Sequence, residues 1–241
     1  MPRDITLLAL LNRLRGELRL SLNPAHNAQV RDTHILKLQA QQERLWADYD
    51  WPHLRVHRFI RLQRNQRYYA PPEGIAIDRI ESVEVKFGGD WRPLGVNINA
   101  EHMSAYDSDA GETSWPVERW RIGEGERIEV WPVPAENGDG DSTREGQLKV
   151  WGIRNLRPLV ADDDRCDLDS ELLVLFVAAD LLVPVDKEEA TRKLAAAEAR
   201  YLKMRGNLTP SRSFKLFGGA EVAKRVVRGP PTIHYRDRET G

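Results

Sequence analysis

Two histidines, His53 and His57, stand four residues apart, the spacing of two metal ligands on one face of a helix. Pro52 and the alternation of apolar and polar residues after it predict a strand here instead. In a strand, side chains four residues apart share a face but lie roughly 13 Å from each other. No Glu or Cys completes a ligand set with them, so we expect neither a metal ion nor a cofactor.

Two acidic segments could also hold a cation. Residues Asp162 to Asp164 are three consecutive aspartates before an apolar segment, where negative charge at a helix start is favourable, so capping of that helix is expected. The loop from Glu136 to Asp141 superficially resembles a calcium loop but lacks the bidentate Glu and the flanking helices. We expect residues 136–145 to form a long exposed hairpin loop.

The candidate nucleophiles lack the partners that would activate them. Cys166 has no catalytic motif around it, and Ser211 and Ser213 have no His or Asp at a recognisable spacing. Gly123 and Gly125 are a glycine pair between strand-like segments, but no glycine-rich phosphate loop follows a strand and opens a helix. We therefore expect a protein that is not an enzyme.

A run of arginines with interleaved aromatic residues suggests contact with DNA or RNA. Strand alternation divides these arginines between two faces, which weakens a single basic stripe. A nucleic-acid-binding module without catalysis therefore stays an alternative function. The residues are Arg55, Arg58, Arg61, Arg64 and Arg67, with Phe59, Tyr68 and Tyr69.

The composition, 41% hydrophobic and 30% charged over 241 residues, permits one large domain or two small ones. The formal net charge of -1 gives no global signature of nucleic-acid binding. A single cysteine excludes an intramolecular disulfide framework and fits a reducing cytosol. The longest apolar block, residues 172–179, is too short to span a bilayer, and charges interrupt the first apolar run. We expect a soluble intracellular protein without a signal peptide or membrane contact.

Residues 1–52 are expected to form a helical hairpin. Asp4 can cap a first helix, which Asn23 and Pro24 break. A second helix, capped by Asn27, ends before Pro52, because the residue before a proline disfavours helical geometry. The apolar faces comprise Leu7, Leu11, Leu14 and Leu18 in the first helix, then Val30, His34, Leu38, Leu45 and Tyr49 in the second.

Residues 53–160 change from a period of 3.6 to a period of 2. Apolar and polar residues alternate over 54–62 and 83–87, and further strand-like segments lie at 118–122, 127–131 and 147–153. Gly88, Gly89 and Asp90 predict a hairpin turn. Short strands separated by Gly, Pro and Asp are typical of an antiparallel sheet or a small sandwich.

Residues 161–206 return to the helical period. The apolar segment 168–183 predicts a buried helix, and Asp186 with Glu189 resembles a capping box that opens the next one. The apolar face of that helix comprises Ala190, Leu194, Ala197, Tyr201 and Met204, and Gly206 is expected to end it. The predicted fold class is α+β: a bundle of four main helices with an inserted antiparallel β domain and a C-terminal arm.

Residues 207–241 are expected to form that extended arm. Seven basic residues stand against three acidic ones, with aromatic and aliphatic residues scattered among them. Because disordered tails usually lack such residues, the arm either orders on a partner or folds back on its own domain. We expect partner binding through Arg212, Phe214, Lys215, Phe217, Lys224, Arg225, Arg228 and Tyr235.

Trp46, Tyr49, Trp51 and Pro52 lie where the helical hairpin ends and the strands begin. No catalytic or ligand constellation surrounds them, so we expect a structural junction rather than a ligand platform. This junction would fix the angle at which the β domain leaves the helices. A second connection is expected near residues 158–164.

The chain carries a Trp-x-x-x-x-Trp-Pro-x-Leu pattern from Trp46 to Leu54, a Tyr and a Pro at Tyr69 and Pro72, an Ile-x-x-Val at Ile80 to Val83, and a Trp-Pro-x-Pro at Trp131 to Pro134. A segment Leu156-Arg157-Pro158-Leu159, the aspartates and an apolar helix follow. In this order, over residues 1–205, the chain resembles the head-to-tail adaptor proteins of tailed bacteriophages. It is similar to the tail tubular or gatekeeper-type connector proteins of short-tailed phages.

This resemblance implies a structural virion protein, assembled in the host cytoplasm, that forms a ring, usually a dodecamer, under the portal vertex. It implies that the portal protein binds the C-terminal arm and that a tail nozzle or tube protein binds below. Double-stranded DNA would be held in the central channel, or pass through it, without sequence specificity. Residues 207–241 match the arm by position and composition, not by a shared motif.

Overall fold

The computed structural model describes residues 3–208 and has two compact units. One unit comprises Met1–Asp48 together with Arg157–Gly241, and the other comprises Tyr49–Leu156. The first unit is helical in its described residues and the second is built on antiparallel sheets, which confirms the predicted α+β class.

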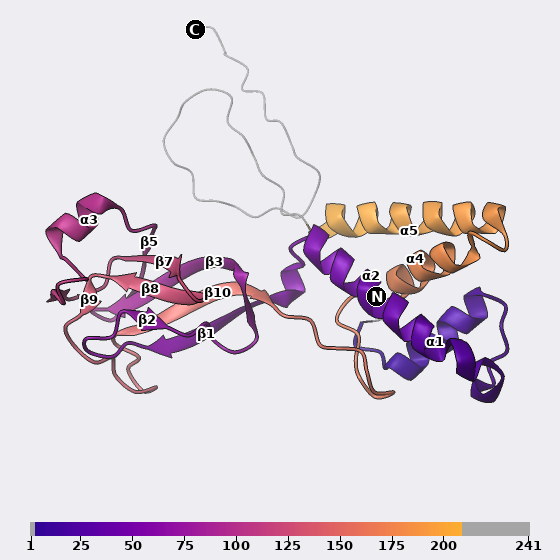
Figure 1. The fold of residues 1–241 in the computed structure, drawn as a ribbon, viewed down its shortest axis with the longest axis horizontal. Helices are drawn as coiled ribbons and strands as arrows, with labels where there is room; N and C mark the ends of the chain where they lie inside the picture. Colours follow the sequence, from indigo (N-terminus) through magenta and orange to yellow (C-terminus); the bar gives the residue numbers. More distant parts are fainter. Residues whose placement is uncertain (1–2, 209–241) are drawn as a thin grey trace, which may run out of the picture. The chain divides into compact units, whose positions relative to one another are not determined.

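The helical unit is built from pairs of packed helices. Helix α1 contacts α2 and α4, α2 contacts α4, and α4 packs along α5, as Figure 1 shows for the last pair. A 3₁₀ helix, η1, leads directly into α2. The elements are α1 (Leu7–Glu17), η1 (Pro24–Val30), α2 (Arg31–Asp48), α4 (Ser170–Leu182) and α5 (Lys187–Leu208).

Helix α1 begins two residues later than the sequence predicts. Thr6, not Asp4, is its N-cap, and the Thr6 hydroxyl accepts the N–H of Ala9 at 3.3 Å. Asp4 cannot cap because its carboxylate accepts hydrogen bonds from Arg157 and Arg165 instead. Leu7, Leu11 and Leu14 of the expected apolar face are fully buried, whereas Leu18 is the C-cap and only half-buried, and Leu10, which the prediction did not include, is also fully buried.

Helix α2 also begins differently. Asn27, the predicted cap, lies within η1, whose own cap is Asn23. His34, Leu38 and Leu45 are buried as predicted, but Val30 precedes α2 and is exposed.

The three aspartates at 162–164 do not cap the helix that follows them. Asp169 caps α4 through a 2.9 Å hydrogen bond from the N–H of Leu172. The backbone carbonyls of Asp162 and Asp164 instead accept the N–H groups of Leu8 and Leu7 in the first turn of α1. These backbone carbonyls therefore accept N–H groups that have no partner within α1, at the start of a helix far away in the sequence.

Helix α5 starts as predicted and ends later. The Asp186 carboxylate accepts the N–H of Glu189 at 3.0 Å, and Ala190, Ala197 and Met204 are buried. Gly206 lies within the helix, which continues to Leu208, so its predicted role as the C-terminal cap is wrong. A Cβ at Gly206 would meet nothing within 4 Å, so close packing does not require glycine at this position.

The β unit contains two four-stranded sheets, in the orders β1-β10-β3-β4 and β2-β8-β7-β5. Most neighbours are antiparallel, but β5 pairs with β7, and β6 with β9, in parallel. The strands are β1 (Arg55–Arg61), β2 (Tyr68–Tyr69), β3 (Ile75–Phe87), β4 (Asp90–Pro93), β5 (Gly95–Val96), β6 (Thr113–Ser114), β7 (Arg119–Gly123), β8 (Arg127–Trp131), β9 (Val133–Pro134) and β10 (Gln147–Arg154).

Both four-stranded sheets contribute to one hydrophobic core, as in a sandwich. Val83 and Val85 of β3 and Val150 of β10 meet Trp120 of β7 and Ile128 of β8 in this core. The glycine pair at 88–89 turns β3 into β4 with positive φ at both residues, as the sequence predicts.

Two connections differ from the sequence expectation. A short helix α3 (Ala100–Ala105) that buries none of its residues was not predicted. The loop at 136–145 is mostly exposed, as predicted, but it is anchored at Gly138, which is buried and donates its N–H to Leu62 O at 2.9 Å. A Cβ on Gly138 would lie 2.1 Å from Gly146 O, so the loop is packed tightly at this point.

Candidate interaction surfaces

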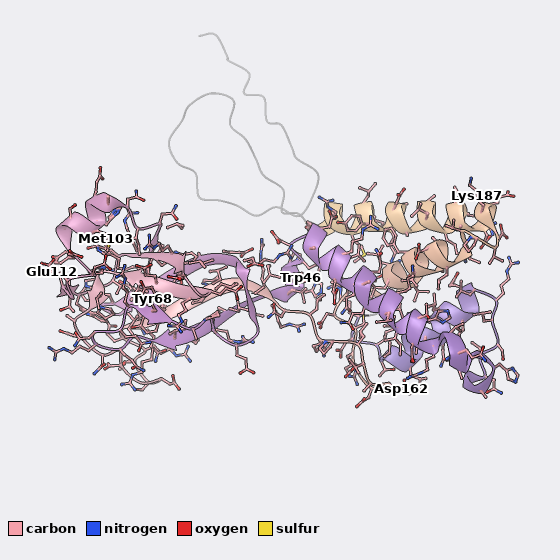
Figure 2. All side chains as sticks on the ribbon, in the orientation of Figure 1. Trp46, Tyr68, Met103, Glu112, Asp162 and Lys187 are labelled. Atoms are coloured by element: carbon pink, nitrogen blue, oxygen red, sulfur yellow. The ribbon has the colours of Figure 1, made fainter. Side chains whose placement is uncertain are left out.

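The aromatic residues after α2 pack against one another. Trp51 is fully buried, with its ring edge-to-face against Tyr49 at 5.2 Å between centroids and against His53 at 6.1 Å. Pro52 opens a short 3₁₀ helix, η2 (Pro52–Leu54), and holds Trp51 in an extended conformation. Trp46 is half-buried near the end of α2 (Figure 2). A buried Trp51 offers no open ring face to a ligand.

The segment that re-enters the helical unit is held by buried polar groups. The Asp167 carboxylate accepts the backbone N–H of Arg157 at 2.7 Å and its Nε at 2.8 Å. The side-chain amide of Gln42 donates to Arg157 O and accepts from the N–H of Asp167, both at 3.3 Å. Arg157 also donates to Asp4, and this hydrogen bond is the main reason that the pKa of Asp4 is lowered.

A buried ion pair fixes α4 against α5. The Asp169 carboxylate that caps α4 accepts Nε and Nη2 of Arg200 at 2.8 and 2.9 Å. Arg200 also pairs with Glu171 in the first turn of α4. Such a bidentate pair defines the position of one helix relative to the other.

The arginines proposed to contact nucleic acid do not form one free stripe. Arg55 pairs with Glu81 at 2.8 Å, and Arg67 pairs with the buried Glu129 at 2.7 Å. Arg61 donates its Nε to Gly138 O at 2.5 Å. Arg58 and Arg64 are exposed. Arg55 and Arg67 are therefore neutralised, and the charge that this region can offer to a phosphate backbone is limited to Arg58, Arg61 and Arg64.

The aromatic residues interleaved with these arginines also make contacts within the chain. Tyr69 is buried, with its hydroxyl hydrogen-bonded to the backbone of residues 63 and 66, and burial raises its pKa to about 12. The Arg144 guanidinium covers the Phe59 ring at 3.9 Å, while Tyr68 is partly exposed beside Arg67. Bases stack on free ring faces, so this arrangement disfavours a single-strand platform.

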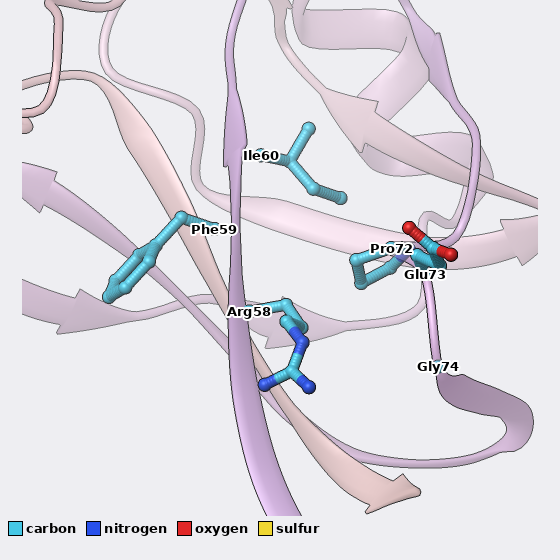
Figure 3. Close-up of a pocket in the computed structure, with 6 residues that line it drawn as sticks. All are labelled: Arg58, Phe59, Ile60, Pro72, Glu73 and Gly74. Atoms are coloured by element: carbon cyan, nitrogen blue, oxygen red, sulfur yellow. The ribbon is translucent and has the colours of Figure 1, made fainter. Parts of the chain in front are cut away.

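A shallow open depression of about 580 Å³ lies between β1 and the segment before β3. Figure 3 shows its lining: Arg58, Phe59 and Ile60 on one side, and Pro72, Glu73 and Gly74 on the other. It brings one guanidinium and one carboxylate to an apolar surface. No nucleophile or histidine is among these lining residues, so the depression does not form a catalytic constellation.

The candidate metal and nucleophile residues are separated or buried. Among the described residues, no three His, Cys, Asp or Glu side chains cluster closely enough to hold a metal ion. His57 stacks on Trp151 at 4.7 Å, whereas His53 lies in η2 beside Trp51. Cys166 is fully buried, and burial raises its pKa to about 12, which leaves the thiol unreactive.

The most developed concave surface of the helical unit lies between α2, α4 and α5. Two depressions of about 470 and 430 Å³ share Gln41, Arg44 and Phe176 in their lining. We refer to them together as the α2/α4/α5 groove. Its other lining residues are Lys37, Ala40, Leu45, Ala47, Asp48, Val177, Ala179, Asp180, Val183, Lys187, Ala190, Thr191, Leu194 and Tyr201.

The sequence pattern did not reveal this groove. Leu194 belongs to the predicted apolar face of α5, yet its side chain is 41% exposed on the groove wall. Lys37, Gln41 and Arg44 recur at helical spacing and share one face of α2. This spacing predicts a groove only when α4 and α5 are known to lie beside that face.

The predicted partner-binding residues of the C-terminal arm, Arg212 to Tyr235, lie outside the described residues. Within residues 3–208, none of the helices combines the length and apolar character needed to cross a bilayer.

A family model described as SU10 adaptor protein matches residues 5–221, which includes both units and the start of the predicted arm. No curated protein matches the chain.

Proposed function

Because the chain belongs to the SU10 adaptor protein family, we propose that it forms a ring under the portal vertex of a tailed phage and joins the portal to the tail. Family membership makes it a structural phage adaptor and a virion component. The match over residues 5–221 is the observation that carries the proposal, because it spans nearly every element described above.

The proposed architecture is a bundle of four helices with an inserted β domain. The grouping of Met1–Asp48 with Arg157–Gly241 around a separate unit, Tyr49–Leu156, supports it. In this architecture the buried Trp51 and the Arg157–Asp167 contacts lie at the two points where the chain passes between the domains.

The C-terminal arm is proposed to bind the portal protein, through Arg212, Phe214, Lys215, Phe217, Lys224, Arg225, Arg228 and Tyr235. Its sequence combines hydrophobic anchors with cations, the residue types that dominate binding energy at protein interfaces. A tail nozzle or tube protein is proposed to bind on the other side of the ring. Double-stranded DNA in the channel would be contacted without sequence specificity, and twelve copies are the proposed ring size.

We propose no catalytic role. The buried thiol of Cys166 and the lack of a nucleophile in the depression beside β1 support this view. The charge neutralisation of Arg55 and Arg67 likewise favours the adaptor over a general nucleic-acid-binding module.

Deletion of the arm tests the proposal for portal binding. The deletion should start at residue 209, because α5 continues to Leu208 and a cut at 207 would remove part of the helix. We expect the truncated chain to keep its circular dichroism spectrum and to lose co-purification with the portal protein. Full occupancy of the truncated chain on the portal would contradict the proposed role of the arm.

A further inference from the structure

We propose that the α2/α4/α5 groove receives one face of α2 from a second copy of this chain, so that neighbouring subunits contact head to tail. We call this face, which comprises Asp32, Leu36, Gln39 and Glu43, the Leu36 flank. This inference rests on the proposed ring and specifies the surfaces that would build it. Both surfaces belong to the helical unit, and both are exposed in the described structure.

The Leu36 flank presents one exposed leucine between two exposed carboxylates. Leu36 is 70% exposed and is the most exposed leucine of the described side chains. Leucines of an amphipathic helix are usually buried. Asp32 and Glu43 are exposed at i−4 and i+7 from it, and therefore lie on the same flank of α2. Gln39 lies between them and donates to Glu43 at 3.1 Å.

The groove offers a complementary pattern, with an apolar floor and cations around it, and the two carboxylates of its lining, Asp180 and Asp48, already pair with Lys37 and Arg205. Phe176, Val183 and Leu194 supply the apolar surface, and Lys37, Arg44 and Lys187 supply positive charge. Lys37 already pairs with Asp180 at 2.6 Å. Arg44 and Lys187 form no ion pair with any residue of the described chain, so their charges are available to a partner.

The two surfaces are different and lie on different flanks of one helix. At 3.6 residues per turn, Lys37 and Arg44 project from α2 roughly 100° away from the Leu36 flank. One subunit can therefore use both surfaces toward two different neighbours, which is the requirement for a heterologous contact that closes into a ring.

The C-terminal segment is the less suitable occupant of the groove. It carries seven basic residues against three acidic ones, so it would bring positive charge against Arg44 and Lys187. The Leu36 flank instead brings two carboxylates and a leucine. Charge complementarity thus favours a second copy over the chain's own C-terminal residues.

Cysteine cross-linking of the full-length chain, mixed with the portal protein, tests the inference. Tagged Leu36→Cys and untagged Leu194→Cys variants are mixed in equal amounts and oxidised, and disulfide-linked heterodimers are counted on a gel. Each variant alone should give no dimer. The native Cys166 does not compete, because it is fully buried.

Leu202→Cys is the matched control for Leu194→Cys. Leu202 is a leucine on the same helix, is 66% exposed and does not line the groove. We expect roughly tenfold or more cross-linking for the Leu36/Leu194 pair than for the Leu36/Leu202 pair, because cysteines whose Cα atoms lie more than about 7 Å apart cannot be bridged without backbone movement, and only the groove position comes close to residue 36 in the proposed contact. Equal yields would overturn the inference.

The double variant Leu36→Cys/Leu194→Cys distinguishes the geometry of the contact. A head-to-tail contact gives a ladder of covalent oligomers, whereas a reciprocal contact stops at a dimer and would overturn the heterologous arrangement. Electron microscopy of the same samples separates this inference from the proposed function. A ring without cross-links rejects only the docking described here, and the absence of both ring and cross-links rejects both proposals.

Discussion

Arg157 contacts the buried carboxylate of Asp167 twice, through its backbone N–H at 2.7 Å and through its guanidinium Nε at 2.8 Å. Residues 157–167, which return the chain to the helices, are thereby closed into a loop. Gln42 of α2 binds both ends of this loop, at Arg157 O and at the N–H of Asp167. The helical unit thus depends on a polar contact that no hydrophobic periodicity reveals.

Asp167→Asn should destabilise the helical unit. The substitution removes the charge that Arg157 pairs with and replaces one acceptor oxygen by a donor. Since Arg157 is partly exposed, we expect a loss of about 1–3 kcal/mol in the free energy of unfolding, measured by urea titration. Asp163→Asn, a few residues away at an exposed position, is the control and should leave the midpoint unchanged. Equal effects of the two substitutions would show that the contact contributes nothing.

The stability of the helical unit should fall as the pH drops below about 6.5. His34 of α2 is buried, and its pKa is lowered from 6.5, first by burial and then by the charge of Arg15. The folded chain therefore resists protonation of His34, whereas the unfolded chain takes up a proton below pH 6.5. Stability is fully present above pH 6.5 and is lost as the pH falls from 6.5 to the lowered pKa of the folded chain, at up to about 1.4 kcal/mol per pH unit.

The measurement is a comparison of thermal unfolding at pH 7.5 and pH 5.0 in the native chain and in His34→Gln. Glutamine cannot take up a proton, so the variant should lose less stability on acidification than the native chain. An identical acid dependence in both proteins would assign the effect to the carboxylates, among which Asp4 and Asp164 have lowered pKa values.

Gly138→Ala should destabilise the β unit, because a Cβ at this position would meet Gly146 O at 2.1 Å. A shift of backbone in a packed loop typically costs about 1–3 kcal/mol. Gly140→Ala, two residues later, meets nothing within 4 Å and is the matched control. Differential scanning calorimetry of both variants provides the comparison. A Gly138→Ala chain as stable as the Gly140→Ala chain would contradict the described packing of the loop.

Trp51→Ala should impair assembly on the portal more than any other single change at the junction. The side chain is fully buried, and truncation of a buried tryptophan costs about 3–5 kcal/mol. Trp51→Phe keeps most of the apolar contact with Tyr49 and His53 and should assemble nearly as well as the native chain. Portal co-purification, together with the unfolding temperature of each variant, gives the result. Unchanged assembly of Trp51→Ala would argue against a structural role for the junction.

The sequence predicts those elements in which a single pattern determines the outcome. The leucines of α1, the continuous apolar segment of α4 and the alternation over residues 83–87 of β3 each determine which side chains must be buried. The hairpin at Gly88 and Gly89 follows from the backbone conformation that only glycine adopts easily.

The features that the sequence did not predict depend on residues far apart in the chain. The backbone carbonyls of Asp162 and Asp164 accept the first N–H groups of α1, because the segment that leads back from the β unit lies against the first turn of this helix. Asp4 is diverted from capping by Arg157 and Arg165, each more than 150 residues away. Helix α3 and the parallel pair β5–β7 are too short to carry a period, and the groove beside Leu194 exists only once α2 meets α4 and α5.

The most direct test of the proposed function is electron microscopy of the full-length chain mixed with the portal protein of its phage. The adaptor proposal predicts closed rings of this chain on one face of the portal, absent when the chain is truncated after residue 208. Particles in which the portal carries no ring, with the chain remaining monomeric at every mixing ratio, would contradict it.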